Sequence, residues 1–151
     1  MGYIEDLRKK IGHDLVILVG SGVIVHKGGK VLLQKRTDDG RWALHGGCKE
    51  LGETTEETAK RELFEETGLI ADELTLLGVF SGEAMRHTYP HGDDVEFVLT
   101  FYICDSFHGE LNPQPEEVST LEWFDLDALP EDLASSDKLA LESFIASINN
   151  P

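Results

Sequence analysis

GGCKELGETTEETAKRELFEETGL, residues 46–69, is the stretch that decides the fold of this 151-residue chain. Its second part, residues 55–67, carries the clearest helix signals in the sequence. Thr54 or Thr55 offers a side-chain oxygen for an N-terminal cap, and Gly68 stands where a C-terminal cap glycine belongs. The sequence therefore predicts a helix over residues 55–67.

The predicted helix has an acidic face and an apolar stripe. Glu62, Glu65 and Glu66 are three and four residues apart, so their side chains share one face within roughly 100° of arc. Ala59 and Leu63 form an apolar stripe that packs the helix on a core. Three like charges destabilise a helix unless something positive lies among them. The acidic face is interpreted either as a solvated surface or as a cation site.

The glycine-rich stretch before the helix favours the cation site. Within residues 46–53, Gly46, Gly47 and Gly52 let the backbone approach a ligand closely because they carry no side chain. Hard cations such as Mg²⁺ or Mn²⁺ prefer carboxylate and carbonyl oxygens and usually keep several waters. A carboxylate face beside exposed glycine backbone supplies both kinds of ligand.

The spacing of these residues matches a known motif. Five residues separate Gly47 from Glu53, seven separate Glu53 from Arg61, and the run RELFEETGL follows at residues 61–69. In this respect the segment resembles the complete signature of the Nudix hydrolase family. The resemblance implies an α+β fold, a Nudix-type α/β/α sandwich with a central mixed β-sheet.

The resemblance also assigns roles to individual residues. The metal ligands that it implies are Glu62, Glu65, Glu66 and the backbone carbonyl of Gly46. Arg61 would pair with Glu53 and hold the loop against the helix. The cofactor implied is Mg²⁺ or Mn²⁺.

A glutamate from outside the motif often completes the metal site in this family. Glu117 is the first choice here, with Glu116 and Glu96 as weaker candidates. The alternative for Glu117 is an ordinary solvated loop glutamate. The general base that takes a proton from the attacking water could be Glu53, Glu62 or Glu117, and the sequence does not choose among them.

Two residues near the motif depart from its usual surroundings. Many relatives read Trp-x-Leu-Pro-Gly-Gly at residues 42–47, and this chain has His45 in place of the proline that stiffens the loop. His45 is interpreted as a tolerated substitution, the alternative being an imidazole near the phosphates. Cys48 is expected to be structural, because metal-dependent hydrolysis needs no thiol nucleophile.

Substrate contacts are expected mainly from the polar stretch at residues 83–94, which offers a cation, stacking rings and hydrogen-bond groups. The alternative is an ordinary polar surface loop. Trp42 is either a pocket wall or part of the core. The residues predicted to bind substrate are Arg36, Trp42, Arg86, His87 and Tyr89. Met85 stands where ADP-ribose-cleaving relatives often carry proline, and Tyr89 is offset from the tyrosine of dinucleoside-polyphosphate relatives, so the substrate is predicted only by class.

The rest of the chain shows one mixed α and β domain over residues 1–151, because no repeat or linker divides it. Residues 1–12 are expected to form a short helix or an arm. Strands are predicted within residues 15–36, with a glycine interruption at 20–22, and at residues 74–80, 95–104 and 121–124. Residues 42–52 and 81–94 are predicted loops, and 137–148 an amphipathic helix.

Composition limits the partners. The net charge of -16 argues against binding a nucleic-acid backbone or an anionic membrane surface, since both repel an acidic protein. No apolar stretch approaches the length of a membrane span, and the first residues lack the features of a signal peptide. Two cysteines are too few for a disulfide framework. These features predict a cytoplasmic protein, and a homodimer is compatible with the resemblance because relatives are often dimers.

The function expected is that of a metal-dependent pyrophosphohydrolase. Water would attack phosphorus in the diphosphate linkage of a nucleoside diphosphate joined to another group, or of a nucleoside triphosphate. The alternative is a Nudix domain that senses a nucleotide without turning it over, although such domains commonly lose the motif glutamates that are intact here. A plain interaction domain with an acidic surface helix is disfavoured by the complete motif.

Overall fold

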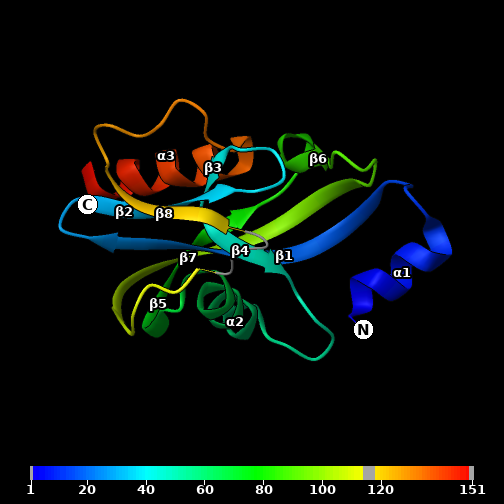
Figure 1. The fold of residues 1–151 in the computed structure, drawn as a ribbon, viewed down its shortest axis with the longest axis horizontal. Coiled ribbons are helices and arrows are strands. Elements are labelled where there is room, and N and C mark those ends of the chain that lie inside the picture. Colours follow the sequence, from blue (N-terminus) through cyan, green and yellow to red (C-terminus); the bar gives the residue numbers. More distant parts are fainter. Residues whose placement is uncertain (1, 114–117, 150–151) are drawn as a thin grey trace.

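The computed structural model describes residues 2–113 and 118–149. Figure 1 shows the chain as a sheet with helices on either side. In chain order the elements are α1 (Tyr3–Ile11), β1 (Val16–Lys27), β2 (Lys30–Arg36), β3 (Trp42–Ala43), β4 (His45–Cys48), α2 (Thr55–Thr67), β5 (Ile70–Phe80), the 3-10 turn η1 (Glu83–Met85), β6 (Arg86–Thr88), β7 (Asp94–His108), β8 (Val118–Asp125) and α3 (Ser135–Asn149).

The strands form a mixed sheet whose main order is β3-β2-β1-β7-β5. β1 and β7 run parallel, in a register that pairs Val16 with Val95 and Val25 with Cys104. The other strand pairs are antiparallel, and β4, β6 and β8 join β1, β7 and β2 respectively. Two long strands far apart in sequence therefore form the centre of the sheet.

Helices α2 and α3 cover opposite sides of the sheet (Figure 1). One buried cluster joins Ala59 and Leu63 of α2 to Val23, Val25 and Leu32 of the sheet, among others. A second cluster lies under α3 and contains Ala140, Leu141 and Phe144 together with Ile24 and Leu33. Alternate residues of β1 thus face different helices, as expected for a strand buried on both faces. The predicted α/β/α sandwich with a mixed sheet is confirmed.

The predicted glycine interruption of the first strand is wrong, because β1 is continuous through residues 20–22. A Cβ on Gly22 would lie 2.3 Å from Cε1 of Phe101, and one on Gly20 would lie 2.8 Å from the carbonyl oxygen of Gly47. These glycines make room for neighbouring strands inside the sheet instead of ending it.

The two predicted loops also contain secondary structure. Residues 42–52 include β3 and β4, and β4 pairs with β1 from Gly20–Cys48 to Val23–His45. Residues 81–94 include η1 and β6, and β6 pairs with β7. Strands this short carry no alternation that sequence reasoning can detect.

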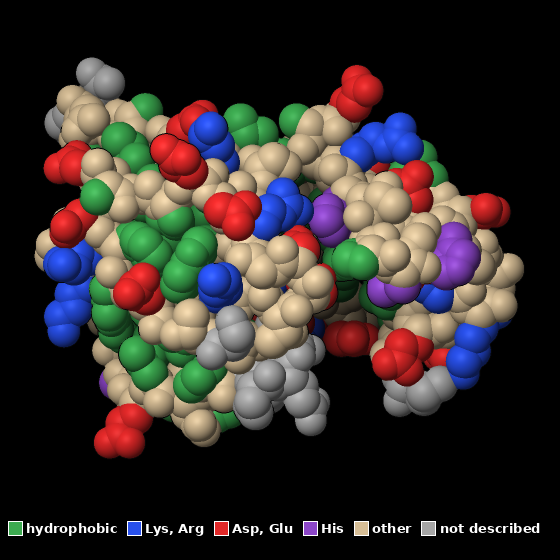
Figure 2. Space-filling view, turned by 45° about the horizontal axis from the view of Figure 1, so that its top comes forward, with side chains coloured by type: hydrophobic (Ala, Val, Ile, Leu, Met, Phe, Trp, Pro, Cys, Tyr) green, Lys and Arg blue, Asp and Glu red, His purple; other side chains and the backbone are tan. Residues whose placement is uncertain are grey.

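The expected N-terminal helix is present as α1, which lies at the end of the molecule remote from β2 and β8 (Figure 1). Arg8 connects it to the sheet, since Nη2 donates to the carbonyl oxygen of Asp94 at 2.8 Å. Across the part of the chain that the structure describes, no helix has the length and apolar character needed to span a membrane. Figure 2 shows acidic side chains scattered over the surface in view, without a single acidic patch.

Candidate active site

Helix α2 has the bounds predicted from sequence and is capped at both ends. The backbone N–H of Glu57 donates to the Thr54 hydroxyl at 3.1 Å, and the Glu57 carboxylate accepts from the Thr54 N–H at 3.0 Å. This reciprocal pair is a capping box. Gly68 ends the helix in the left-handed conformation, with φ 84°, and its N–H bonds the carbonyl of Phe64. The caps fix where the glutamates of the helix stand.

Arg61 is the hydrogen-bonding centre of the site. Its Nε lies 2.7 Å from Oε2 of Glu53 and its Nη2 lies 3.0 Å from Oε1, so the expected contact between these two residues is present. Nη2 also donates to the carbonyl of Cys48, and Nη1 donates to Glu62 at 2.9 Å. Hydrogen bonding to Arg61 lowers the pKa of Glu53 to about 2. The loop before α2 is therefore tied to the helix.

The carboxyl groups of Glu62 and Glu66 are close enough for each to shift the pKa of the other. Glu66 is 4% exposed, and burial followed by the neighbouring Glu62 raises its pKa well above the usual range. Burial also raises the pKa of Glu62. Two buried carboxyl groups this close cannot both ionise without nearby positive charge.

Glu65 completes the acidic face and is more open. Its side chain is 44% exposed, and Oε2 lies 3.3 Å from Nη1 of Arg61. Among the described residues, Arg61 forms ion pairs with Glu62 and Glu65, and none is formed with Glu66. An all-oxygen donor set with excess negative charge is what a hard divalent cation requires, so these residues fit such an ion.

Two glycines of β4 allow this close packing. A Cβ on Gly47 would lie 2.5 Å from Cδ of Glu62, so the absence of a side chain lets the carboxylate rest against the backbone. A Cβ on Gly46 would lie 2.3 Å from the carbonyl oxygen of Ser21. The N–H of Gly46 donates to Oε1 of Glu66 at 3.2 Å, which puts this stretch of backbone beside the carboxyl pair.

Glu62 and Glu66 line a cavity of about 510 Å³. Four of the five predicted substrate-binding residues line it as well: Arg36, Arg86, His87 and Tyr89. The structure thus brings Glu62 and Glu66 of α2 together with side chains of β2 and of the segment between β5 and β7.

The cavity side chains are held by their neighbours. Arg36 pairs with Asp38 at 2.7 Å, which raises the pKa of the guanidinium, and Arg86 pairs with Asp94 at 3.2 Å. The rings of His87 and Tyr89 meet edge to face at 4.6 Å. Burial lowers the pKa of His87 and raises that of Tyr89, so both are neutral near pH 7.

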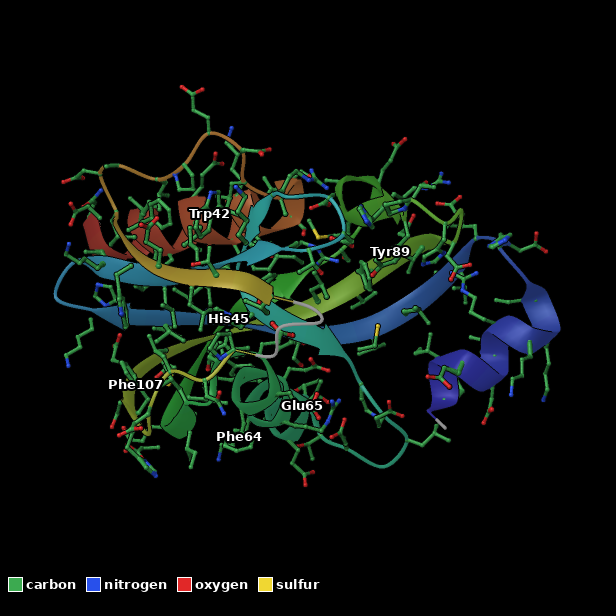
Figure 3. All side chains as sticks on the ribbon, viewed as in Figure 1. Trp42, His45, Phe64, Glu65, Tyr89 and Phe107 are labelled. Carbon is green, nitrogen blue, oxygen red and sulfur yellow. The ribbon has the colours of Figure 1, made fainter. Side chains whose placement is uncertain are left out.

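Trp42 is the exception among the predicted substrate contacts. It does not line the cavity and packs edge to face on Phe124, with ring centroids 4.8 Å apart. Figure 3 shows it beside α3 and well separated from Tyr89. The structure supports the interpretation of Trp42 as core, because its ring packs against the buried cluster under α3.

Only one of the three candidates for the additional glutamate lies in the part of the chain that the structure describes. Glu117 and Glu116 lie outside the described residues. Glu96 lies on β7, opposite Arg86 of β6, and does not line the cavity.

His45 and Cys48 have the environments of structural residues. His45 is fully buried, its Nε2 donates to the carbonyl of Leu32 at 3.0 Å, and burial lowers its pKa to about 4. Its imidazole therefore bonds β4 to β2, in a position where proline would stiffen the chain. Burial and the nearby Glu62 raise the pKa of the Cys48 thiol to about 11, which keeps it neutral.

Asp137 is a cavity residue that sequence reasoning missed. It stands in the first turn of α3, lines the cavity, and accepts from the backbone N–H of Leu44 at 3.0 Å. Burial raises its pKa to about 6. An acidic residue in the first turn of a helix is common because it suits the helix dipole, so the sequence carried no distinctive signal.

The fold, and the glutamates of α2 that Arg61 holds in place, agree with the Nudix hydrolase family that the motif indicated. The NUDIX domain model matches residues 17–144, and the chain belongs to this family. An ADP-ribose pyrophosphatase of Methanocaldococcus jannaschii is 40% identical over 111 residues, which cover 72% of this chain and 62% of the relative. An oxidized purine nucleoside triphosphate hydrolase of Danio rerio is 32% identical, covering 72% and 66%. The chain thus spans less than two thirds of either relative.

Solved structures give the same result for the fold. A MutT NUDIX hydrolase from Burkholderia pseudomallei superposes with a TM-score of 0.73 at 32% identity, covering 85% of this chain and 98% of that one. A MutT protein from Bacillus halodurans gives a TM-score of 0.67 at 34% identity, covering 83% and 80%. Members of the family generally need divalent cations.

Proposed function

We propose that this protein is a divalent-cation-dependent pyrophosphohydrolase acting on a nucleoside diphosphate joined to another group, or on a nucleoside triphosphate. The observation that carries the proposal is the shared cavity of Glu62, Glu66, Arg36 and Tyr89. Of the two relatives above, one is named for a nucleoside diphosphate joined to another group, ADP-ribose, and the other for nucleoside triphosphates.

The cation would be Mg²⁺ or Mn²⁺, held by the acidic face of α2 and the adjoining backbone. The proposed ligands are Glu62, Glu65, Glu66 and the carbonyl of Gly46, with Glu117 as a further candidate. When bound, such an ion screens phosphate charge and lowers the pKa of an attacking water. Its charge would also favour the ionised form of Glu66, whose pKa burial raises.

Glu53 is proposed to position the site and not to act as its base. Its Oε1 already accepts from the Glu50 N–H at 2.9 Å, from the Thr58 hydroxyl at 3.0 Å and from Arg61, while Oε2 accepts from Arg61. A carboxylate with a pKa near 2 is also a poor proton acceptor. Glu62 and Glu117 remain the proposed proton acceptors.

The remaining cavity residues would bind the substrate. Arg36 and Arg86, together with Arg41, bring positive charge to a cavity that also carries acidic side chains, as the binding of a phosphorylated ligand requires. Tyr89 and His87 present rings for stacking on a base or ribose. Asp39 and Asp137 also line the cavity and can accept hydrogen bonds from donors on the ligand.

Turnover of a substrate panel tests this proposal. The panel would contain nucleoside diphosphate derivatives and nucleoside triphosphates, assayed with Mg²⁺ or Mn²⁺. Glu65→Gln and Glu66→Gln should lose activity by orders of magnitude, whereas Glu56→Gln, an exposed residue of the same helix, should not. Equal activity in all variants would sink the metal-site assignment. If no compound were turned over but nucleotides still bound, the alternative of a Nudix domain that senses a nucleotide without hydrolysing it would be favoured.

Three further proposals concern the domain organisation, the cellular compartment and the assembly of the chain. We propose that residues 1–151 form one domain and that the protein works in a reducing cytoplasm, because Cys48 and Cys104 are both free thiols. A homodimer is proposed on the exposed apolar residues Ile17 and Val19 of β1 and Leu15 just before it. Light scattering measures the assembly directly.

A further inference from the structure

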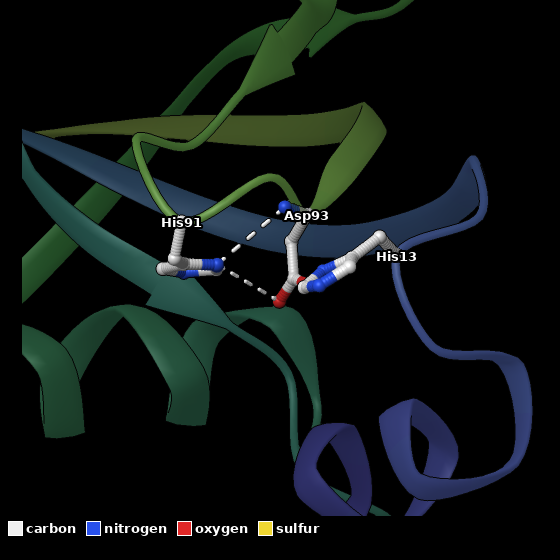
Figure 4. Close-up of side chains that lie close together, drawn as sticks. All are labelled: His13, His91 and Asp93. Atoms are coloured by element: carbon white, nitrogen blue, oxygen red, sulfur yellow. Dashed lines mark hydrogen bonds and ion pairs between the residues drawn. The ribbon is translucent and has the colours of Figure 1, made fainter.

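His13, His91 and Asp93 bring two imidazoles and a carboxylate together outside the cavity (Figure 4). One ligand atom from each residue lies within 4.8 Å of the others. Nδ1 of His13 is 2.6 Å from Oδ1 of Asp93, and Nδ1 of His91 is 3.6 Å from Oδ2. None of the three residues lines the cavity that holds the motif glutamates.

Backbone hydrogen bonds fix the relative positions of these side chains. The N–H of Asp94 donates to the carbonyl of His13 at 3.3 Å, so the segment after α1 is paired with the start of β7. The turn that carries His91 and Asp93 is closed by bonds from Tyr89 N–H to the carbonyl of Asp93 and from Gly92 N–H to the carbonyl of Tyr89, each 2.9 Å long. A site built on paired backbone loses little conformational entropy on binding an ion.

The donor set selects a class of metal ion. Imidazole nitrogen with one carboxylate oxygen suits borderline ions such as Zn²⁺, whereas Mg²⁺ prefers oxygen donors alone. In a tetrahedral zinc site with bonds of about 2.0–2.2 Å, neighbouring ligand atoms lie roughly 3.3 Å apart. The contact between His13 and Asp93, now 2.6 Å, has to widen by roughly 0.7 Å, which a rotation of the exposed His13 side chain provides.

The surroundings of the three side chains affect how readily they can bind an ion. Arg8 lies with Nε 3.5 Å from Oδ2 of Asp93 and competes for that oxygen, while Oδ1 faces His13. The side chains of His13 and His91 are 68% and 61% exposed, so an incoming ion can keep water in its remaining coordination position. Figure 2 shows histidine side chains gathered toward one end of the molecule.

We propose that His13, His91 and Asp93 form a second metal site, specific for a borderline divalent ion such as Zn²⁺. The ion would join the segment after α1 to the turn between β6 and β7. The ring of His91 stacks on that of Tyr89, with centroids 5.4 Å apart and planes 3° apart. Zinc at this site therefore orders the segment that carries a cavity ring, and this site does not depend on the proposed hydrolase activity.

Zinc titration of the tag-free protein tests the proposal. Excess Mg²⁺ is kept present for the glutamate site, and the pH is held above 7 because protons compete with metal ions for their ligands. The NMR signals of the imidazole rings report where zinc binds, and competition with a chelator gives the dissociation constant. The ring signals of His13 and His91 should shift at the first equivalent, before those of His108, which has one carboxylate partner, Asp72 at 2.7 Å.

Variants separate the site from general surface binding. His91→Ala and His13→Ala should each weaken zinc binding by about 10–100-fold, and His108→Ala should leave it unchanged. His91→Ala keeps the Arg8–Asp93 pair and the backbone bonds of the turn, so a folding defect does not explain its effect. Unchanged zinc affinity in His91→Ala, or equal shifts at His108, would overturn the proposal.

Discussion

Glu53 accepts two hydrogen bonds from the guanidinium of Arg61, one from Nε at 2.7 Å and one from Nη2 at 3.0 Å. The two residues are eight positions apart and join the glycine-containing loop to α2. The same guanidinium also donates to Glu62 of α2 and to the carbonyl of Cys48 at the end of β4. One side chain therefore links the helix, the loop before it and β4.

The first prediction concerns the brace that Arg61 and Glu53 form between the loop and α2. Arg61→Lys keeps the charge but loses the planar fork, so the free energy of unfolding should fall by about 1–3 kcal/mol in urea titrations. Arg41→Lys is the matched control, because Arg41 pairs with Asp39 at the surface at 3.3 Å and such pairs contribute about 0–1 kcal/mol. Similar losses in the two variants would show that the brace contributes no more than a surface pair.

The second prediction concerns the contact between Gly47 and Glu62. In Gly47→Ala the new Cβ would lie 2.5 Å from the carboxyl carbon of Glu62 and displace it. We expect binding of Mn²⁺, followed by its electron paramagnetic resonance signal, to weaken on the order of tenfold. Gly78→Ala is the control, because the nearest atom to its Cβ is 3.7 Å away and its φ is not positive. Equal Mn²⁺ affinity in the two variants would contradict the predicted displacement.

The parts of the site that follow from local signals were predicted from the sequence. The bounds of α2 follow from Thr54, Glu57 and Gly68, which interact within a few residues of one another. Local hydrogen-bonding groups and helical periodicity are enough for such predictions. The contact between Arg61 and Glu53, in contrast, was expected only from the resemblance to the Nudix signature, and the structure contains it.

The predictions that failed concern contacts between residues distant in sequence. The role of Gly22 inside β1 depends on the ring of Phe101, which arrives from β7. Asp137 meets Leu44 across 93 positions, and the packing of Trp42 on Phe124 likewise joins separate parts of the chain. No pattern within a short window encodes these contacts, so neither the continuous strand nor the missed cavity residue was predictable.

The third prediction is a pH dependence of stability due to His45. Burial lowers its pKa to about 4 in the folded protein, against about 6.5 in the unfolded chain. Between these values the unfolded chain binds more protons, so stability falls as the pH is lowered from about 6.5 to about 4. The full loss from this residue would be roughly 3 kcal/mol. His45→Leu should flatten this part of a pH series of urea titrations, and the exposed His108→Leu should not. A slope unchanged by His45→Leu would contradict the assignment.

The fourth prediction has the opposite sign and concerns Asp137. Burial raises its pKa to about 6 in the folded protein, above the usual 3.8, so the folded state binds the proton more tightly. The contribution of Asp137 is therefore most favourable below pH 4 and becomes less favourable as the pH rises through 6. Asp137→Asn keeps an oxygen that can accept from the Leu44 N–H and removes the ionisation.

At pH 7 to 8, Asp137→Asn should raise the free energy of unfolding by about 1–2 kcal/mol, less than the roughly 3 kcal/mol of the full shift because the side chain is partly exposed to water. At pH 4 the variant and the parent should be equally stable. Ser136→Asn, at the neighbouring cavity position, controls for the added amide. A variant less stable than the parent at pH 8 would show that the ionised carboxylate stabilises the start of α3, and that the Arg36 and Arg41 charges outweigh the cost of burial.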